Sequence, residues 1–158
     1  MGRISDRLAE RDLELPALFA PPPPQKEFKF DRVRVSGGTA YVSGHGPLDG
    51  HHVLVTGKVG GEVSAEGGYE AARLTALSVL ASLQDELGDL DRVTGWVKLL
   101  GLVNCAPGFN ATPGVINGFS DLVLELWGDA GRHARSAIGA SELPFDMAVE
   151  VEAIVEVS

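Results

Sequence analysis

The clearest pattern in the chain is the alternation of apolar and polar residues over residues 147–157. One face of this segment carries Met147, Val149, Val151, Ala153, Val155 and Val157. The other face carries Ala148, Glu150, Glu152, Ile154 and Glu156. A period of two predicts a β-strand. Shorter runs of the same kind predict strands at residues 32–35, 39–43 and 135–140, and a weaker one at 51–56.

Two longer segments have the 3.6-residue period that is typical of helices. The first spans residues 64–87, with Ser64 as the expected N-cap and Gly88 at the C-terminal end. The second begins at Thr112, followed by Pro113, and ends before Gly128.

The N-terminal region is different in character from the rest of the chain. Its first residues predict a short amphipathic helix capped by Ser5 and ended by Pro16. Four consecutive prolines, residues 21–24, then predict an extended polyproline connector. We therefore expect a surface arm and connector over residues 1–27, and one folded domain over residues 28–158.

The order of the elements predicts an α+β fold with a sheet of five to six strands and two helices on one face. Residues 92–104 are apolar on both faces, with Trp96, Leu100 and Leu102 opposite Val97 and Leu99, which predicts a central strand covered on both sides. Two helices cannot cover both faces of such a sheet. We therefore expect an oligomer in which the sheets of neighbouring subunits pack together.

Composition and charge restrict the possible partners. The 158 residues include 13 Lys and Arg against 22 Asp and Glu, a net charge of −9. Lys and Arg do not cluster, which argues against nucleic-acid binding and against an anionic membrane surface. No apolar run approaches the roughly 20 residues of a membrane span. With one cysteine and a charged, non-secretory start, the chain is expected to be cytoplasmic.

The common catalytic and cofactor-binding motifs are missing from the sequence. It has no dinucleotide-binding glycine motif, no Walker loop and no Gly-x-Ser-x-Gly elbow. The four histidines lack metal-ligand spacing and are interpreted as turn and surface residues. Cys105 follows apolar residues with no nearby cation, so we expect an inert thiol. Neither a metal nor an organic cofactor is predicted.

One pair of residues remains as candidate chemistry. Arg135 begins a predicted strand in an acidic region, and Glu150 lies on the polar face of the last strand. We expect these two strands to pair around the turn at residues 143–146, which would place both side chains on adjacent strands. An Arg can bind a carboxylate through two hydrogen bonds, and a Glu can hold a water or accept its proton. By spacing alone, a simple cross-strand salt bridge is the favoured interpretation of this pair.

The segment from Arg135-Ser136-Ala137 through Leu143-Pro144 to Val149-Glu150-Val151-Glu152 closely resembles the signature of the RidA/YjgF family, also called endoribonuclease L-PSP. The segment Tyr41-Val42-Ser43-Gly44-His45-Gly46-Pro47 resembles the "SGQ-x-P" strand end of that family. The resemblance covers residues 28–158. It implies a chorismate-mutase-like fold of the bacillus type and a homotrimer with ligand sites between subunits.

The resemblance also implies an activity, the hydrolysis of reactive 2-imino or 2-enamino acids to 2-keto acids and ammonia. The position of Arg135 binds the substrate carboxylate in the family, and that of Glu150 orients the attacking water. Ser43, Gly44 and Asn117 fall where the family has further site residues.

Two positions depart from the family's deaminases. Phe30 stands where they usually carry a Tyr, and Ala137 where they often carry a Cys. A trimer that binds small carboxylates without turnover is therefore the alternative to an enzyme. A ribonuclease is a third and weaker hypothesis, because the domain is acidic and has no pair of histidines for acid–base work.

Overall fold

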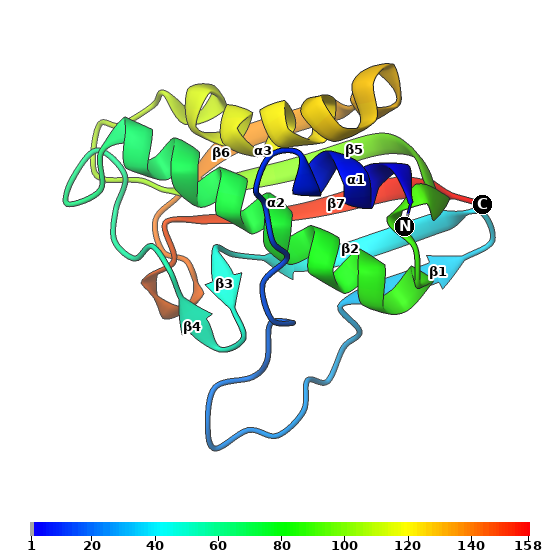
Figure 1. Ribbon diagram of the computed structural model, residues 1–158. Helices are drawn as coiled ribbons and strands as arrows, with labels where there is room; N and C mark the ends of the chain where they lie inside the picture. Colours follow the sequence, from blue (N-terminus) through cyan, green and yellow to red (C-terminus); the bar gives the residue numbers. More distant parts are fainter. Residues whose placement is uncertain (1) are drawn as a thin grey trace.

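A computed structural model describes residues 2–158 and contains one mixed five-stranded sheet in the order β1-β2-β7-β5-β6 (Figure 1). The strands are β1 (Val33–Ser36), β2 (Thr39–His45), β5 (Val93–Asn104), β6 (Ala134–Ala140) and β7 (Val149–Val157). A separate two-stranded ribbon consists of β3 (Leu48–Asp49) and β4 (His52–Val53). Of the strand predicted at 51–56, only β4 and an isolated bridge from Thr56 to Met147 form. The predicted α+β fold is confirmed.

Two long helices cover one face of the sheet, α2 (Ala65–Leu87) and α3 (Thr112–Trp127) (Figure 1). The predicted cap of α2 is confirmed, since the Ser64 hydroxyl accepts a hydrogen bond from the amide of Gly67. The two helices approach closely at Gly118, where an added Cβ would lie 2.0 Å from the carbonyl oxygen of Tyr69. Only glycine permits this contact, so Gly118 sets the distance between the helices.

The predicted pairing of residues 135–140 with residues 147–157 is wrong. Strand β5 lies between them, parallel to β6 and antiparallel to β7. The reason is the connection through α3, because a strand–helix–strand unit places its two strands side by side and parallel. Strand β6 is therefore one of the two edge strands of the sheet, opposite β1, and Arg135 lies on it.

The predicted faces of β5 are also partly wrong. The register of β5 against β7 shifts between Trp96 and Lys98, and this irregularity turns Trp96 toward the helices. Its ring is buried and packs against Phe119 and Trp127, while Val97 is left 40% exposed. The described residues place helices on one face of β5 only.

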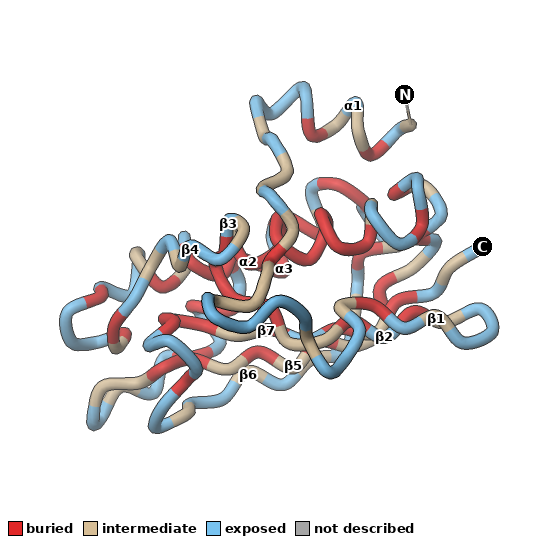
Figure 2. The backbone as a smooth tube through the Cα atoms, turned by 90° about the horizontal axis from the view of Figure 1, so that it is seen from below, coloured by how far each residue is buried: buried red, intermediate tan, exposed pale blue. Residues whose placement is uncertain are grey.

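The N-terminal helix α1 (Arg3–Ala9) lies on the side of α2 and α3 that faces away from the sheet, as a third layer (Figure 2). Ile4 and Leu8 are buried and belong to the main hydrophobic core. The predicted cap at Ser5 is wrong, because the helix begins at Arg3. The N-terminus of the helix is capped by a residue distant in sequence. The carboxylate of Asp91 accepts hydrogen bonds from the amides of Arg3 and Ile4, at 2.7 and 2.8 Å.

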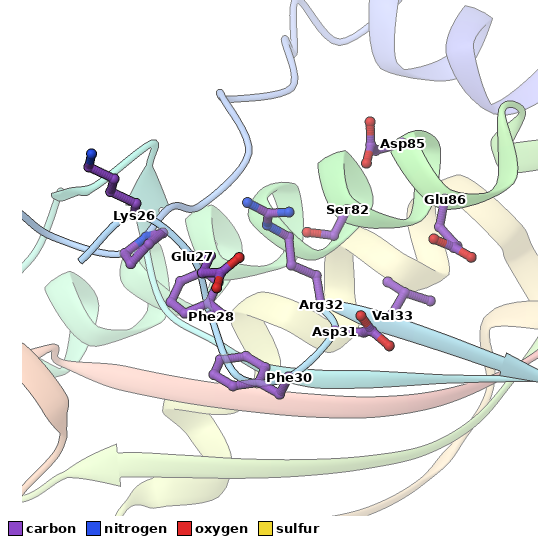
Figure 3. A pocket seen from close by; sticks show the side chains of 11 residues that line it. Lys26, Glu27, Phe28, Phe30, Asp31, Arg32, Val33, Ser82, Asp85 and Glu86 are labelled. Atoms are coloured by element: carbon purple, nitrogen blue, oxygen red, sulfur yellow. The ribbon is translucent and has the colours of Figure 1, made fainter.

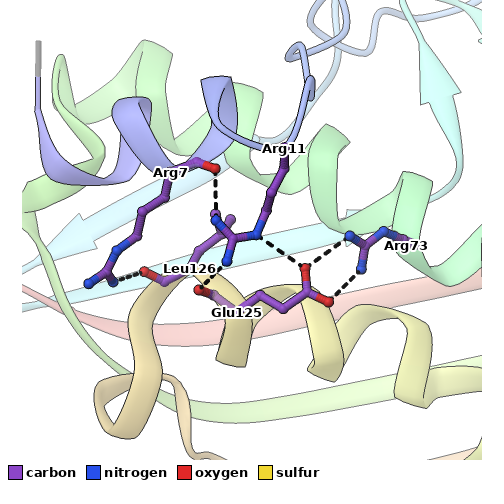
Figure 4. A network of polar contacts seen from close by, with 5 residues as sticks. All are labelled: Arg7, Arg11, Arg73, Glu125 and Leu126. Atoms are coloured by element: carbon purple, nitrogen blue, oxygen red, sulfur yellow. Dashed lines mark hydrogen bonds and ion pairs between the residues drawn. The ribbon is translucent and has the colours of Figure 1, made fainter.

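The other end of α1 is held by charged and polar contacts with α3 (Figure 4). The Arg7 guanidinium donates to the carbonyl of Leu126. Glu125 forms ion pairs with Arg11, at 3.6 Å, and with Arg73 of α2, at 3.0 Å. Helix α1 is thus attached at both ends, and the buried side chain of Ile4 fills space in the core.

We predict that Ile4→Ala lowers the free energy of unfolding by about 2 to 4 kcal/mol, because it leaves a cavity under α1. Urea unfolding followed by circular dichroism measures this change. The exposed side chain of Arg3 provides the control, and Arg3→Ala is expected to change stability by less than about 0.5 kcal/mol. Equal small effects would show that α1 is only loosely attached.

Candidate functional site

A pocket of about 390 Å³ opens beside the start of β7 and is closed on one side by the N-terminal connector, residues 10–32 between α1 and β1. Its lining is mainly apolar. The lining residues are Phe19, Ala20, Pro22, Phe28, Phe30, Gly44, Gly46, Leu48, His51, Val53, Pro144, Phe145, Met147 and Glu150. Three of the predicted site residues, Phe30, Gly44 and Glu150, are therefore together in one pocket.

Glu150 supplies the carboxyl group of this pocket. It lies on β7, and Gly44 lies beside it on β2, where an added Cβ would be 2.9 Å from Oε1 of Glu150. The absence of a side chain at Gly44 thus leaves room for the carboxyl group. Burial raises the pKa of Glu150, and the nearby charge of Glu152 raises it further. A half-buried carboxyl group of this kind can exchange a proton with a bound ligand.

Aromatic rings form one border of the pocket. The rings of Phe30 and Phe28 are 4.8 Å apart, and those of Phe28 and Phe19 are 4.9 Å apart. Phe30 is 53% exposed, so it lies at the mouth, whereas Phe19 is buried. Sequence reasoning identified Phe30 but missed Phe19 and Phe28, which lie in or next to the segment interpreted as a connector.

A strained turn forms the opposite border. Phe145 and Asp146, in the short 3₁₀ segment η3 (Pro144–Asp146), have φ values of 57° and 56°, a region that side chains other than glycine rarely adopt. Asn104 stabilises this turn, because its amide Nδ2 donates to Oδ1 of Asp146 and to the carbonyl of Met147, both at 3.1 Å. The sequence offered no signal for this role of Asn104.

His45 lies underneath the pocket, between Gly44 and Gly46, and is fully buried. Its Nδ1 is 2.6 Å from the carbonyl of Ser43 and must donate to it, so Nε2 accepts from the hydroxyl of Ser82 at 2.8 Å. Burial lowers the pKa of His45 to about 4. The interpretation of this histidine as a turn or surface residue is wrong, since it is a neutral core residue.

Ser43 does not line the pocket but is next to it in the chain. Its hydroxyl donates to the carbonyl of Asp31 at 2.6 Å, and its amide donates to the carbonyl of Arg32 at 2.9 Å. These bonds fix the segment that carries Phe30. The contact of Ser43 with a ligand stays a prediction.

The remaining predicted residues form a second group at the edge strand β6. Arg135 donates through Nη1 to Oδ1 of Asn117, at 2.8 Å, and to the hydroxyl of Ser120, at 3.0 Å. Its Nη2 donates to the carbonyl of Pro113, at 3.2 Å. Ala137 is close by, and its carbonyl accepts a bond from Thr112 at 2.9 Å. Arg135, Asn117 and Ala137 are thus assembled where α3 begins.

The two groups lie on opposite faces of the sheet. On β5, Leu99 is the partner of Arg135 and Leu102 is the partner of Glu150. Residues three apart on a strand point to opposite faces, and Leu99 is fully buried under the helices. The predicted proximity of Arg135 and Glu150 within one chain is wrong, and the described residues contain no salt bridge between them.

A smaller hollow of about 290 Å³ shares Phe28 and Phe30 with the main pocket (Figure 3). Arg32 is one of the charged residues that line this hollow, and its Nε donates to the carbonyl of Phe19 at 2.7 Å. The guanidinium also lies over the rings of Phe19 and Phe28, 5.4 and 5.8 Å from their centroids. These contacts hold the two aromatic rings of the connector in place.

Comparison with known proteins assigns this fold first to a class, the chorismate-mutase-like α+β proteins. The family model described as "YjgF/chorismate_mutase-like, putative endoribonuclease" matches residues 5–157. The chain belongs to this family, the RidA/YjgF family, as its C-terminal signature predicted. The matched range includes most of α1 and the connector.

Three relatives illustrate the similarity. Protein TCP17 of Trypanosoma cruzi is 40% identical over 158 residues, which cover 99% of this chain and 96% of that protein. The crystal structure of Atu1372 from Agrobacterium tumefaciens is 37% identical, with a TM-score of 0.89 over 99% of this chain and 93% of that one. E. coli TdcF, crystallised with bound serine, is 19% identical, with a TM-score of 0.60 over 92% of this chain and 96% of its own.

Two further findings concern the described residues as a set. None of their helices is both long and apolar enough to cross a membrane. Nowhere in residues 2–158 do three His, Cys, Asp or Glu side chains gather as metal ligands would.

Burial raises the pKa of the Cys105 thiol, which opposes its ionisation.

We predict that the neutral state of His45 makes stability depend on pH. The unfolded chain binds a proton at this residue below about pH 6.5, whereas the folded protein resists protonation until about pH 4. The free energy of unfolding therefore decreases as the pH falls from about 6.5 to 4. His45→Gln, which can replace both hydrogen bonds, is expected to flatten this decrease in urea titrations.

The exposed His51 provides the control for this experiment. His51→Gln is expected to leave the pH profile as it is in the unmodified protein. If His45→Gln and the unmodified protein lose stability in parallel between pH 6.5 and 4, His45 is not the group responsible.

Proposed function

We propose that the protein hydrolyses reactive 2-imino and 2-enamino acids to 2-keto acids and ammonia, in clefts between the subunits of a homotrimer. The observation that carries this proposal is the half-buried carboxyl group of Glu150, which has a raised pKa and lines an apolar pocket. Family membership supports the reaction class. The serine bound to TdcF supports a small carboxylate as the ligand.

The position of Arg135 supports a site that is shared between subunits. Three of its five N–H groups bind Asn117, Ser120 and Pro113. The Nε–H and one Nη2–H have no partner among residues 2–158, and they remain for a substrate carboxylate. Because Arg135 is on the edge strand and faces away from Glu150, a second subunit must contribute one of the two groups.

A cyclic assembly meets this requirement. In a head-to-tail ring, one surface of each subunit contacts a different surface of the next, so Arg135 of one chain can meet Glu150 of its neighbour. The sheet face without helices supports such packing. It exposes the large apolar side chains of Tyr41 (48%) and Ile138 (51%). Covering them in a subunit interface removes apolar surface from water and so stabilises the assembly.

The proposed reaction is an addition followed by an elimination. Glu150 accepts a proton from water as the water oxygen bonds to the C=N carbon, and it returns this proton to the imine nitrogen. Glu150 then takes the proton of the new hydroxyl group and passes it to the amino nitrogen. The C=O double bond forms as the C–N bond breaks, so that ammonia leaves and a 2-keto acid remains. Atoms and charge balance with water alone, so the proposal includes no cofactor. The main contribution of the protein is to orient water and substrate.

The two departures from the family's deaminases affect substrate choice in this proposal. Phe30 retains an aromatic wall without a hydroxyl group, and Ala137 removes a thiol near Arg135. Neither side chain anchors the carboxylate or activates water. We place the activity in the cytoplasm, in keeping with the single thiol of Cys105.

The alternative is a trimer that binds small carboxylates without turnover, which is consistent with the same Arg135 and with the serine bound to TdcF. RNA cleavage, which the family description names, is the weaker candidate. The net charge of −9 opposes binding to a polyanion.

We predict that Glu150→Gln reduces imine hydrolysis by at least about 100-fold, because the amide cannot accept a proton from water. The assay generates imines in place with an amino-acid oxidase and follows their disappearance. Glu152→Gln provides a matched control on the same strand face. It is expected to keep activity and to shift the acid limb of the pH profile downward, because the charge of Glu152 raises the pKa of Glu150.

A shared site also predicts complementation between inactive variants. Arg135→Ala and Glu150→Gln are each expected to be inactive alone. Co-expressed in one assembly, they should recover up to about one quarter of full activity, because a quarter of the interfaces then join an intact Arg135 to an intact Glu150. No recovery in a confirmed mixed trimer would contradict a site shared between subunits.

A further inference from the structure

We infer that the N-terminal connector is part of the substrate site, and that its aromatic residues select substrates with a large apolar side chain, aromatic or branched. This inference rests on the proposed function for the reaction, and it adds the class of substrate. The juxtaposition that supports it is that of Phe19 and Phe28 with Glu150 across one pocket.

The connector is held firmly against the domain. The amide of Ala20 donates to the carbonyl of Gly50 at 3.2 Å, and the amide of Gly50 donates to the carbonyl of Ala17 at 3.1 Å. Arg32 binds the carbonyl of Phe19, and the Phe19 ring packs edge-on against His45 at 4.5 Å. The wall is therefore already formed before a ligand binds.

The part of the pocket nearest the connector is apolar. Phe19, Leu48 and Met147 form a buried hydrophobic cluster, against which Phe28 and Val53 pack. Met147 fits there because residue 46 is glycine, where an added Cβ would lie 2.1 Å from its sulfur. Among the lining residues only Glu150 and His51 carry an ionisable side chain. One end of the pocket thus offers a proton acceptor and the other end offers an apolar surface.

This division matches two parts of a 2-imino acid, the reacting carbon and the side chain. The reacting carbon must lie near Glu150, so the side chain of the substrate extends from it toward Phe19 and Phe28. A volume of about 390 Å³ greatly exceeds the needs of a methyl group. An aromatic or branched side chain fills this space and removes apolar surface from water, whereas a small one leaves it hydrated.

The test measures the binding of two product analogues, pyruvate and phenylpyruvate, to the full chain by isothermal titration calorimetry. Phenylpyruvate is expected to bind at least about tenfold more tightly, in line with the discrimination that apolar pockets achieve. Ala20 lines the pocket, and Ala20→Leu adds volume there. This variant is expected to weaken phenylpyruvate binding about tenfold and to leave pyruvate binding unchanged.

Ala17 provides the matched control, since it lies on the same connector but is exposed and outside the pocket. Ala17→Leu is expected to bind both keto acids as the unmodified protein does. Thermal unfolding confirms that both variants remain folded. The inference is overturned if phenylpyruvate binds no more tightly than pyruvate, or if Ala20→Leu fails to reduce the preference.

The same measurements separate this inference from the proposed reaction. Selective binding of phenylpyruvate without hydrolysis of the corresponding imine would contradict the deaminase activity and leave the pocket assignment in place. Hydrolysis that is equally fast for imines of alanine and phenylalanine would contradict the side-chain selectivity and support the reaction.

Discussion

A β-strand presents successive side chains to opposite faces of its sheet, and this constraint governs the chemistry available to the protein. Arg135 lies on the face covered by helices, and Glu150 lies on the open face two strands away. Two strand spacings amount to roughly 10 Å, so the separation exceeds the reach of a small carboxylate held by both groups. The proposed reaction therefore requires a second subunit, because one chain alone does not bring Arg135 and Glu150 together.

The second feature of general interest is the N-terminal region. Helix α1 adds Ile4 and Leu8 to the main core, and it is capped by Asp91 rather than by its own residues. The connector that follows turns back over the domain and contributes Phe19 to the pocket. The ion pair of Arg11 with Glu125 attaches the chain to α3 just after α1, and the segment that leads to Phe19 continues from there.

Buried polar groups position the walls of the pocket. Asn104 stabilises the strained turn at Phe145 and Asp146, and His45 links the carbonyl of Ser43 to Ser82 of α2. Each group is costly to bury unless it is hydrogen-bonded, so these contacts favour one arrangement of the backbone. We expect them to make the pocket rigid, so that the positions of Gly44 and Glu150 relative to each other do not change.

Local pattern was sufficient to determine the two long helices, most strands and the family, because periodicity and the residues around Arg135 and Glu150 are local features. It placed Phe30, Gly44 and Glu150 among the site residues, and they share one pocket. It could not determine the strand order or the bulge at Trp96, since both depend on contacts between distant segments. For the same reason only the tertiary structure placed Phe19 in the pocket and separated Arg135 from Glu150.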